Sequence, residues 1–397
     1  MISPKIPWPP TTGGMVRVAE IFKNLIKYWC ITFITPIYGS LLETRTHIPE
    51  NMNAEVILAA TSSRSWKRIR GVVSKRPYHY ELYRSSETRE LVAQQIKNKH
   101  FDLIYCHFLY SLQYIPENVN IPILVDQQNV DLQYWQRKIQ VNRGFKRYVS
   151  TWNLWKVKRY ESTQLRRIWA YVSVSNEDRE IIHSYAYPHV KNFFVAPNGV
   201  DTKFYTPVNW AKRIPKREVT LAFLGSFNMD FNRDAAEHLC NILLPKIREK
   251  LPHLAFRIIL IGRNPGERLI SLAKRDKSVT VTGTLENVCP WLKQADIFVA
   301  PLYEGAGTKL KVIEAMACAL PVVGTKIALQ GLGGKDGIHY RRANDDNAFV
   351  GAVCDLASSL KKRIQIGHNG RKLVEDRYDW KKIAKNLAND IQKALIN

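Results

Sequence analysis

The hydrophobic positions in the first 200 residues fall in short runs that are separated by longer, polar stretches of helical character. Apolar runs of three to five residues bounded by polar or turn residues are typical of strands buried in a sheet. The polar stretch Ser86–Lys99 is expected to be one of the intervening helices. The expected strands are Val56–Ala60, Leu103–Cys106, Ile123–Val125, Ala170–Val174 and Phe193–Val195. This alternation predicts an α/β fold with a mainly parallel sheet.

The same rhythm resumes after a break. The stretch Val208–Arg217 is polar and basic, contains Pro215 and follows Pro207, so it is expected to be a linker. The expected strands beyond it are Val219–Leu224, Arg257–Ile261, Val279–Thr282, Asp296–Ala300 and Pro321–Gly324. The expected helices are Arg233–Leu243, Asn287–Lys293, Thr308–Cys318, Ala348–Ser359, Lys361–Val374 and Trp380–Leu395. Because 397 residues exceed one ordinary core, two doubly wound domains are expected, at residues 1–207 and 208–376, with a C-terminal helix at 377–397.

The first strand that such a domain needs is short in this chain. Only Met1–Pro4 precede a proline-rich turn, whereas open α/β domains usually begin with a full buried strand. Either Ile2–Ile6 forms a stub strand, or the natural start lies upstream of Met1.

The segment Asp296–Thr325 carries the clearest chemistry. Its apolar run ends at Pro301 and is followed by the loop Gly305–Thr308, a helix-forming stretch from Lys309 to Ala319, and a second apolar strand. In a βαβ unit, such a loop directs backbone N–H groups and a helix N-terminus at one point, where a phosphate can bind. Taken alone, such a loop is weak evidence, because similar turns more often serve packing only.

Longer motifs in the chain resemble those of a known family. Lys311–Ala317 followed by Pro321–Thr325 resembles the nucleotide-sugar signature of the retaining GT-B glycosyltransferases of group 1 (family 4). Four further stretches resemble the N-domain glycine loop, the strand before the interdomain crossing, the crossing itself, and the first strand of the C-terminal domain: Pro9–Arg17, Val172–Asp178, Pro197–Asp201 and Leu221–Ser226. The resemblance implies two Rossmann-like domains that face a central cleft, with the C-terminal helix crossing back to the N-domain.

The resemblance also implies where a sugar-nucleotide donor binds. Glu314 is expected to hold the ribose hydroxyls, because a carboxylate can accept two of them. Charge that builds on a leaving diphosphate is stabilised best by fixed N–H dipoles and cations. The implied donor-binding residues are Gly13, Gly14, Gly225, Asn232, Arg233, Gly305, Ala306, Gly307, Thr308, Lys311 and Glu314.

The catalytic residues implied are His107, Glu304 and Lys309. His107 follows a strand, and in related enzymes a histidine from this region contacts the donor sugar. Glu304 is offered as the first glutamate of the family's pair, although nine residues separate it from Glu314 where the family has seven. No general base is assigned, since a front-face mechanism in which the leaving phosphate takes the proton is commonly proposed for the family. The acceptor side is expected to include Asp126, Asn129 and Asp131.

The chain is strongly basic, with a net charge of +24, which favours an anionic partner or surface. From Arg137 to Arg167 ten Lys and Arg stand against one acid, Glu161. An apolar stripe runs through the same segment: Phe145, Tyr148, Val149, Trp152 and Trp155. A cationic helix with an aromatic face is typical of contact with an anionic membrane surface.

Two alternative roles for this segment stay open. The stripe can be ordinary core with the charges on a solvated flank, and nucleic-acid binding also uses basic and aromatic residues, although no nucleic-acid-binding module is visible. A second basic and aromatic stretch, Arg64–Arg84, supports the membrane interpretation. An acceptor anchored to lipid would explain both stretches.

The remaining composition narrows the setting. Six scattered cysteines without paired spacing indicate reduced thiols, so a cytoplasmic protein is expected. The basic aromatic segment adds the expectation that it is peripheral at the inner face of the cell membrane. Neither a signal peptide nor an apolar run of membrane-spanning length is visible. No metal motif appears, and no cofactor besides the UDP- or GDP-sugar co-substrate is expected.

The expected reaction moves a sugar to a glycan or lipid-linked acceptor in surface polysaccharide or glycoconjugate assembly. A UDP-sugar epimerase or hydrolase of the same fold would share Glu314 and the glycine loop, but would not need the basic aromatic helix. A dinucleotide dehydrogenase would need Gly-x-Gly-x-x-Gly after the first strand, which this chain lacks. A non-catalytic membrane-binding module would tolerate loss of Glu314.

Overall fold

The computed structural model describes residues 1–10, 12–38, 48–49, 54–61, 70–72, 74–128, 130–186, 189–213, 217–304 and 308–396. The chain forms two compact units, one of Met1–Pro197 with Ala384–Asn397 and the other of Asn198–Ile383. The proline-rich linker had suggested a boundary at 207/208, whereas the contacts divide the chain at Pro197, inside the Pro-Asn-Gly-Val-Asp motif. The last helix, α16 (Trp380–Ile396), runs across the second division.

Parallel strands form the sheet of the first unit. β1 (Thr32–Ile37) pairs with β2 (Glu55–Ala60), and β3 (Ile104–His107), β4 (Ile123–Asp126), β5 (Ala170–Ser173) and β6 (Asn192–Val195) follow one another in a second group. Ile2 joins the two groups, because it bridges to Ile34 in β1 and to Cys106 in β3. The expected stub strand is therefore reduced to the pairing made by Ile2.

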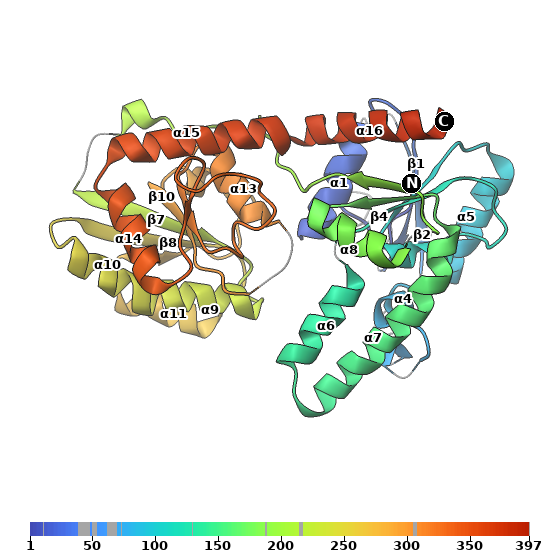
Figure 1. Ribbon diagram of the computed structural model, residues 1–397, viewed down its shortest axis with the longest axis horizontal. Helices are drawn as coiled ribbons and strands as arrows, with labels where there is room; N and C mark the ends of the chain where they lie inside the picture. Colours follow the sequence, from blue (N-terminus) through green and yellow to red (C-terminus); the bar gives the residue numbers. More distant parts are fainter. Residues whose placement is uncertain are drawn as a thin grey trace. The chain divides into compact units, whose positions relative to one another are not determined.

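The helices of this unit are α1 (Gly13–Leu25), α4 (Tyr78–Leu82), α5 (Ser86–Asn98), α6 (Asp131–Val141), α7 (Gly144–Gln164) and α8 (Asn176–Ala186), with 3₁₀ turns η1 (Leu109–Tyr114) and η2 (Leu165–Arg167). Only Asn142 and Arg143 separate α6 from α7, so the two helices form a hairpin that projects from the unit (Figure 1). Gly144, the first residue of α7, has φ +54°, a backbone conformation that glycine adopts without strain.

A six-stranded parallel sheet in the order β12-β11-β10-β7-β8-β9 forms the centre of the second unit. Its strands are β7 (Glu218–Leu224), β8 (Ala255–Ile261), β9 (Val279–Val281), β10 (Ile297–Ala300), β11 (Val322–Gly324) and β12 (Arg341–Arg342). The strand order reverses beside β7, since β8 lies on one side of it and β10 on the other. In open α/β sheets, ligands bind at the carboxyl ends of the strands at this point.

Helices cover the second sheet on both faces, as the ribbon shows (Figure 1). They are α9 (Asp230–His238), a π turn (Leu239–Leu243), α10 (Leu244–Lys250), α11 (Gly266–Arg275), α12 (Cys289–Leu292), α13 (Leu310–Ala317), α14 (Asp346–Ala357) and α15 (Leu360–Arg377), with the 3₁₀ turn η3 (Trp210–Lys212) before β7. All residues of β10 are buried, as the continuous apolar run predicts for a central parallel strand.

The predicted doubly wound α/β architecture is confirmed in both units. β1 and β12 were not predicted. Thr32, Thr35 and Pro36 interrupt the apolar run of β1, and β12 consists of two arginines. Among the described residues, no helix combines the length and the apolar character that crossing a lipid bilayer requires.

Candidate active site

The site in the second unit lies where β7 and β10 end and α13 begins. Gly225 follows β7 directly, and Thr308 and Lys309 lead into α13. A Cβ on residue 225 would lie 2.9 Å from Cγ of Asn232 and 3.1 Å from Nζ of Lys311. A side chain at position 225 would therefore displace Asn232 or Lys311.

Lys311 and Asn232 contact each other across the strand end. The Lys311 ammonium donates to Oδ1 of Asn232, and Nδ2 of Asn232 donates to the carbonyl of Ser226 at 2.9 Å. Nζ of Lys311 also lies 4.9 Å from the ring centroid of Phe223. A hydrogen bond, a backbone anchor and an aromatic face thus fix the ammonium beside the glycine turn.

The electrostatics around Lys311 favour a bound anion. The pKa of Lys311 falls to about 7, because burial and then the neighbouring charge of Lys309 lower it more than Glu314 raises it. Two amines crowd the positive end of α13, so an anion would relieve their repulsion and raise the pKa of Lys311. Thr308 adds a buried hydroxyl, and none of the described groups hydrogen-bonds to it.

Glu314 lies one turn further along α13 and is held by a tyrosine. The hydroxyl of Tyr205 donates to Oε1 of Glu314 at 3.0 Å. Burial raises the pKa of Glu314, while the bond from Tyr205 and the charge of Lys311 oppose that rise. A buried carboxylate with one oxygen engaged can still accept hydroxyl groups on its remaining lone pairs.

Several predicted residues are not part of this cluster. Arg233 forms a surface ion pair with Asp230, one turn away on α9. Glu304 is an exposed residue in the bend after β10, and no contact connects it to Glu314 in the described part of the chain. Gly305, Ala306 and Gly307 lie outside the described residues. Their roles stay predictions.

Asp126 and His107, two of the predicted residues of the first unit, lie at a buried ion pair, whereas Asn129 lies outside the described residues. Arg17 donates to Asp126 through Nε and Nη2, at 3.0 and 2.8 Å, and both side chains are fully buried. The hydroxyl of Tyr105 donates to the same carboxylate at 2.9 Å. Burial opposes ionisation of Asp126, but the charge and hydrogen bonds of Arg17 together with the neighbouring His107 outweigh it and bring the pKa of Asp126 down to about 2.

His107 ends β3 as expected, but it is completely buried rather than open to solvent. Its Nδ1 lies 3.5 Å from Oδ2 of Asp126, too long for a good hydrogen bond, and burial lowers the pKa of His107. The next residue, Phe108, has φ +67°, an outlier for a bulky side chain. The strand end is therefore strained next to the predicted catalytic histidine.

Gly13 and Gly14 begin α1, and Thr12 caps it by accepting from the backbone N–H of Met15. The carbonyl of Gly14 accepts from Nε2 of Gln128 at 3.0 Å. A Cβ on residue 14 would lie 3.1 Å from Oε1 of the same glutamine. The Gln128 side chain would thus have to shift by a few tenths of an ångström to admit a larger residue at 14.

Two groups at the site were missed from the sequence. Tyr205 follows the crossing motif, where its spacing gave no sign that it reaches α13. Arg263, after β8, donates from Nε to Oγ of Ser226 at 3.0 Å and so supports the glycine turn. Neither contact has a sequence signal, because each joins residues that only the fold brings together. The described residues contain no group of three His, Cys, Asp or Glu that could hold a metal ion.

Comparison with known proteins places these motifs in a family. The family model described as "Glycosyltransferase Family 4" matches residues 40–204, and "Glycosyl transferases group 1" matches residues 218–359. The MMP alpha-(1->4)-mannosyltransferase of Mycolicibacterium hassiacum is 28% identical over 51% of this chain and 48% of its own length. The phosphatidyl-myo-inositol mannosyltransferase of Propionibacterium freudenreichii is 29% identical over 54% of this chain and 53% of its own length. The chain thus spans about half the length of these curated relatives.

Solved structures match over almost the whole chain. Sucrose-phosphate synthase from Thermosynechococcus elongatus has a TM-score of 0.70 at 17% identity and covers 99% of this chain and 98% of its own. HepE from Anabaena, solved with UDP and glucose, has a TM-score of 0.67 at 13% identity, with 99% and 98% covered. At these identities the likeness shows the fold alone. Together with the two family models, it establishes that the chain belongs to the group 1 glycosyltransferases of the GT-B fold.

Proposed function

We propose that this protein transfers a sugar from a nucleoside diphosphate to a glycan or lipid-linked acceptor, with retention of anomeric configuration. The observation that carries the proposal is the pair of amines, Lys309 and Lys311, at the positive end of α13, with the Glu314 carboxylate one turn beyond. Cations in front of a carboxylate match a diphosphate joined to a ribose. HepE, which shares the fold, was solved with UDP, and this supports a sugar-nucleotide donor.

The proposed chemistry breaks the bond between the anomeric carbon and the diphosphate oxygen and forms a bond from that carbon to an acceptor hydroxyl. The diphosphate leaves with the electron pair, so negative charge grows on it in the transition state. The ammonium of Lys311, fixed by Asn232, and the first turn of α13 stabilise that charge without reorganising. The acceptor proton passes to the leaving phosphate, and no divalent cation is required by this scheme.

A donor screen tests the proposal. UDP, GDP and their sugars are added to the folded protein, and the cognate nucleotide raises the melting temperature because it binds only the folded state. Glu314→Ala, which removes the ribose acceptor, should abolish both the shift and transfer to an undecaprenyl-linked acceptor. Full activity of this variant would refute the role of Glu314. Release of free sugar or an epimer without an acceptor would favour the epimerase or hydrolase alternative.

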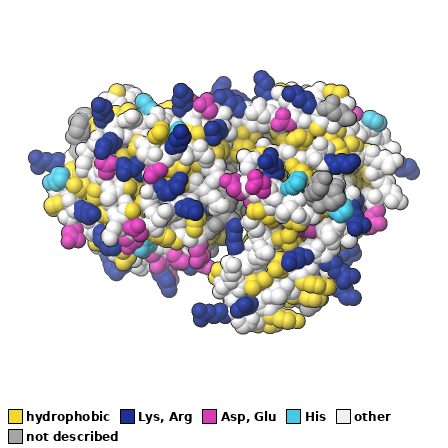
Figure 2. All heavy atoms as spheres, in the orientation of Figure 1, with side chains coloured by type: hydrophobic (Ala, Val, Ile, Leu, Met, Phe, Trp, Pro, Cys, Tyr) yellow, Lys and Arg dark blue, Asp and Glu magenta, His cyan; other side chains and the backbone are white. Residues whose placement is uncertain are grey.

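The acceptor side of the proposal includes an anionic membrane surface, contacted by the α6–α7 hairpin. The hairpin carries large apolar side chains in solvent: Val141 is 66% exposed, Phe145 75%, Tyr148 69% and Trp155 45%. The fold therefore does not bury the whole apolar stripe in the core. Figure 2 shows apolar and basic side chains together over this projecting part of the molecule.

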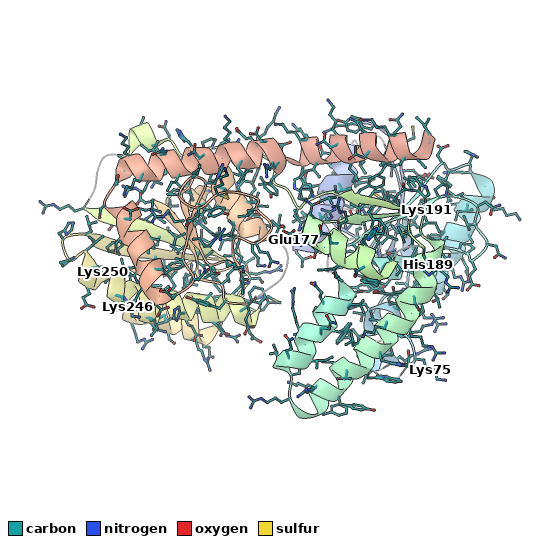
Figure 3. All side chains as sticks on the ribbon, viewed as in Figure 1. Lys75, Glu177, His189, Lys191, Lys246 and Lys250 are labelled. Atoms are coloured by element: carbon teal, nitrogen blue, oxygen red, sulfur yellow. The ribbon has the colours of Figure 1, made fainter. Side chains whose placement is uncertain are left out.

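The basic residues of the hairpin differ in what they can do. Arg143, Lys146 and Arg147 are exposed around the turn between the helices. Lys156, in contrast, is buried and donates to the carbonyl of Gly71 at 2.9 Å, so its ammonium belongs to the unit's interior. Lys75, an exposed residue of the second basic stretch, lies beside α7 (Figure 3). Each exposed cation near anionic lipid contributes about 1 kcal/mol.

Vesicle sedimentation tests this contact. Wild type should sediment with vesicles of phosphatidylcholine and phosphatidylglycerol, but not with pure phosphatidylcholine, and salt should weaken the binding. Arg143→Glu, Lys146→Glu and Arg147→Glu together should abolish it. The control, Lys274→Glu, Arg275→Glu and Lys277→Glu, makes the same charge change on an exposed part of the second unit. Equal loss in both triple variants would show that only net charge matters. Such binding would support the proposal that the protein works at the inner face of the cell membrane.

A further inference from the structure

Tyr205 and Glu314 are 109 residues apart in the sequence and are joined by a side-chain hydrogen bond. Tyr205 lies in the stretch between the crossing motif and β7, and its own N–H donates to the carbonyl of Asp201 at 2.9 Å. Glu314 lies on α13, whose N-terminal end carries the two amines. The bond therefore ties a segment outside the sheet to the proposed donor site.

One arginine fixes both ends of this bond. Arg371, on α15, donates from Nη1 to the carbonyls of Tyr205 and Ala317 and from Nη2 to the carbonyl of Thr202 at 2.8 Å. Ala317 is three residues beyond Glu314 on α13. The backbones that carry the tyrosine and the glutamate are thus held by the same guanidinium, and the position of the phenol follows from that anchoring.

The protonation states make Tyr205 a permanent donor. Burial, followed by the negative charge of Glu314, raises the pKa of Tyr205 far above the physiological range, so the hydroxyl keeps its proton. Burial raises the pKa of Glu314, and the bond from Tyr205 is the largest of the effects that oppose that rise. A hydrogen bond to the ionised form favours the carboxylate.

We propose that Tyr205 is a positioning residue that orients the Glu314 carboxylate for the two hydroxyls of a nucleotide ribose. Its bond uses one lone pair of Oε1 and fixes the plane of the carboxylate. Oε2 and the second lone pair of Oε1 then point away from the phenol and can accept from the ribose. This inference rests on the proposed function, and it makes Tyr205 a determinant of selectivity for ribose over 2′-deoxyribose.

Tyr205→Phe tests the proposal, because it removes one oxygen and keeps the buried ring. The dissociation constants of UDP, GDP and their 2′-deoxy counterparts are measured for the wild type and the variant. One hydrogen bond to an ionised group corresponds to about tenfold to a hundredfold, so the affinity for the ribonucleotide should fall by about tenfold or more. The 2′-deoxynucleotide, which makes one contact fewer with Glu314, should lose less, so the preference for ribose narrows.

Two further measurements separate positioning from general loosening. The acid limb of nucleotide affinity against pH should move to higher pH in Tyr205→Phe, because the pKa of Glu314 rises when its donor is lost. The matched control is Tyr340→Phe, which removes a hydroxyl that donates to the carbonyl of Gly334 at 2.6 Å and should leave the preference unchanged.

The outcomes are distinct. If the wild type prefers ribose and Tyr205→Phe keeps the same preference and the same pH profile, the positioning role is overturned and the proposed function stands. A change in ribose preference in Tyr340→Phe as large as that in Tyr205→Phe overturns it as well. If the wild type binds none of these nucleotides, the proposed function itself fails.

Discussion

Replacing Asp126 by asparagine should destabilise the first unit strongly. Asp126 is buried against Arg17, and its pKa falls from an ordinary 3.8 to about 2 in the fold. A shift of this size corresponds to about 2 kcal/mol of stability, at 1.36 kcal/mol per pKa unit. The variant also leaves the Arg17 guanidinium buried without its counter-charge, and breaking a buried pair typically costs about 3–5 kcal/mol. We therefore expect a loss of about 3 kcal/mol.

The sign of the pH dependence follows from the same pair. The folded pKa is lower than the unfolded one, so the stabilisation is complete above about pH 4 and is lost as pH falls towards 2. Asp126→Asn should remove this part of the acid sensitivity. The free energies of unfolding of wild type and variant should thus differ most near neutral pH and converge in acid.

Hydrogen exchange measured on the full chain reports the stability of the first unit directly. Peptides that cover β4 should exchange faster in Asp126→Asn by the factor that corresponds to the lost free energy. Asp102→Asn is the control, because its carboxylate is 91% exposed in the same unit and its loss should cost less than about 0.5 kcal/mol. The double variant Arg17→Met, Asp126→Leu should recover much of the loss. A cost below about 1 kcal/mol for Asp126→Asn would refute the reasoning from burial.

Three further outcomes are expected. The affinity for nucleoside diphosphates should fall as pH rises through about 7, where Lys311 of the unliganded protein loses its proton. Lys311→Arg should flatten this dependence between pH 6.5 and 8.5, and an unchanged decline in calorimetric titrations of the variant would contradict the role of Lys311. Gly225→Ala should weaken nucleotide binding at least tenfold, because its Cβ displaces Asn232 from Lys311, and wild-type affinity would show that the turn adapts. Lys156→Met should lower thermal stability by about 1–3 kcal/mol by leaving the Gly71 carbonyl unpaired, whereas an unchanged melting temperature would show that this bond is dispensable.

The sequence was most informative where one segment carries both the fold signal and the chemistry. Asp296–Thr325 predicts a strand, a loop, a helix and a strand, and β10, α13 and β11 follow in that order. Lys311 and Glu314 lie on one helix, so their spacing along the chain already fixed their relation. Parallel strands buried on both faces also give continuous apolar runs, which is why β3 to β6 could be located to within a residue or two.

Contacts between distant segments could not be predicted in this way. The pairing of Arg17 with Asp126 joins α1 to β4, and neither residue type is expected to be fully buried. The sequence predicts the apolar stripe on α7 but leaves its exposure open. Periodicity shows that one face of a helix is apolar, but it does not show whether another part of the protein covers that face. His107 illustrates the same limit: its place at a strand end was predicted, whereas its burial was not.

The site in the second unit combines positive charge with burial, and these two properties oppose each other until an anion is present. Burial lowers the pKa of Lys311 and raises that of Glu314, so each group is closer to neutrality than it would be in water. Asn232 and Tyr205 provide one hydrogen bond each to keep these two side chains in place. A diphosphate would restore the full charge of the lysine, and the ribose hydroxyls would favour the carboxylate. The two halves of the donor should therefore bind cooperatively. The binding free energy of the whole nucleotide should be more favourable than the sum of the values measured for a nucleoside and for a free diphosphate.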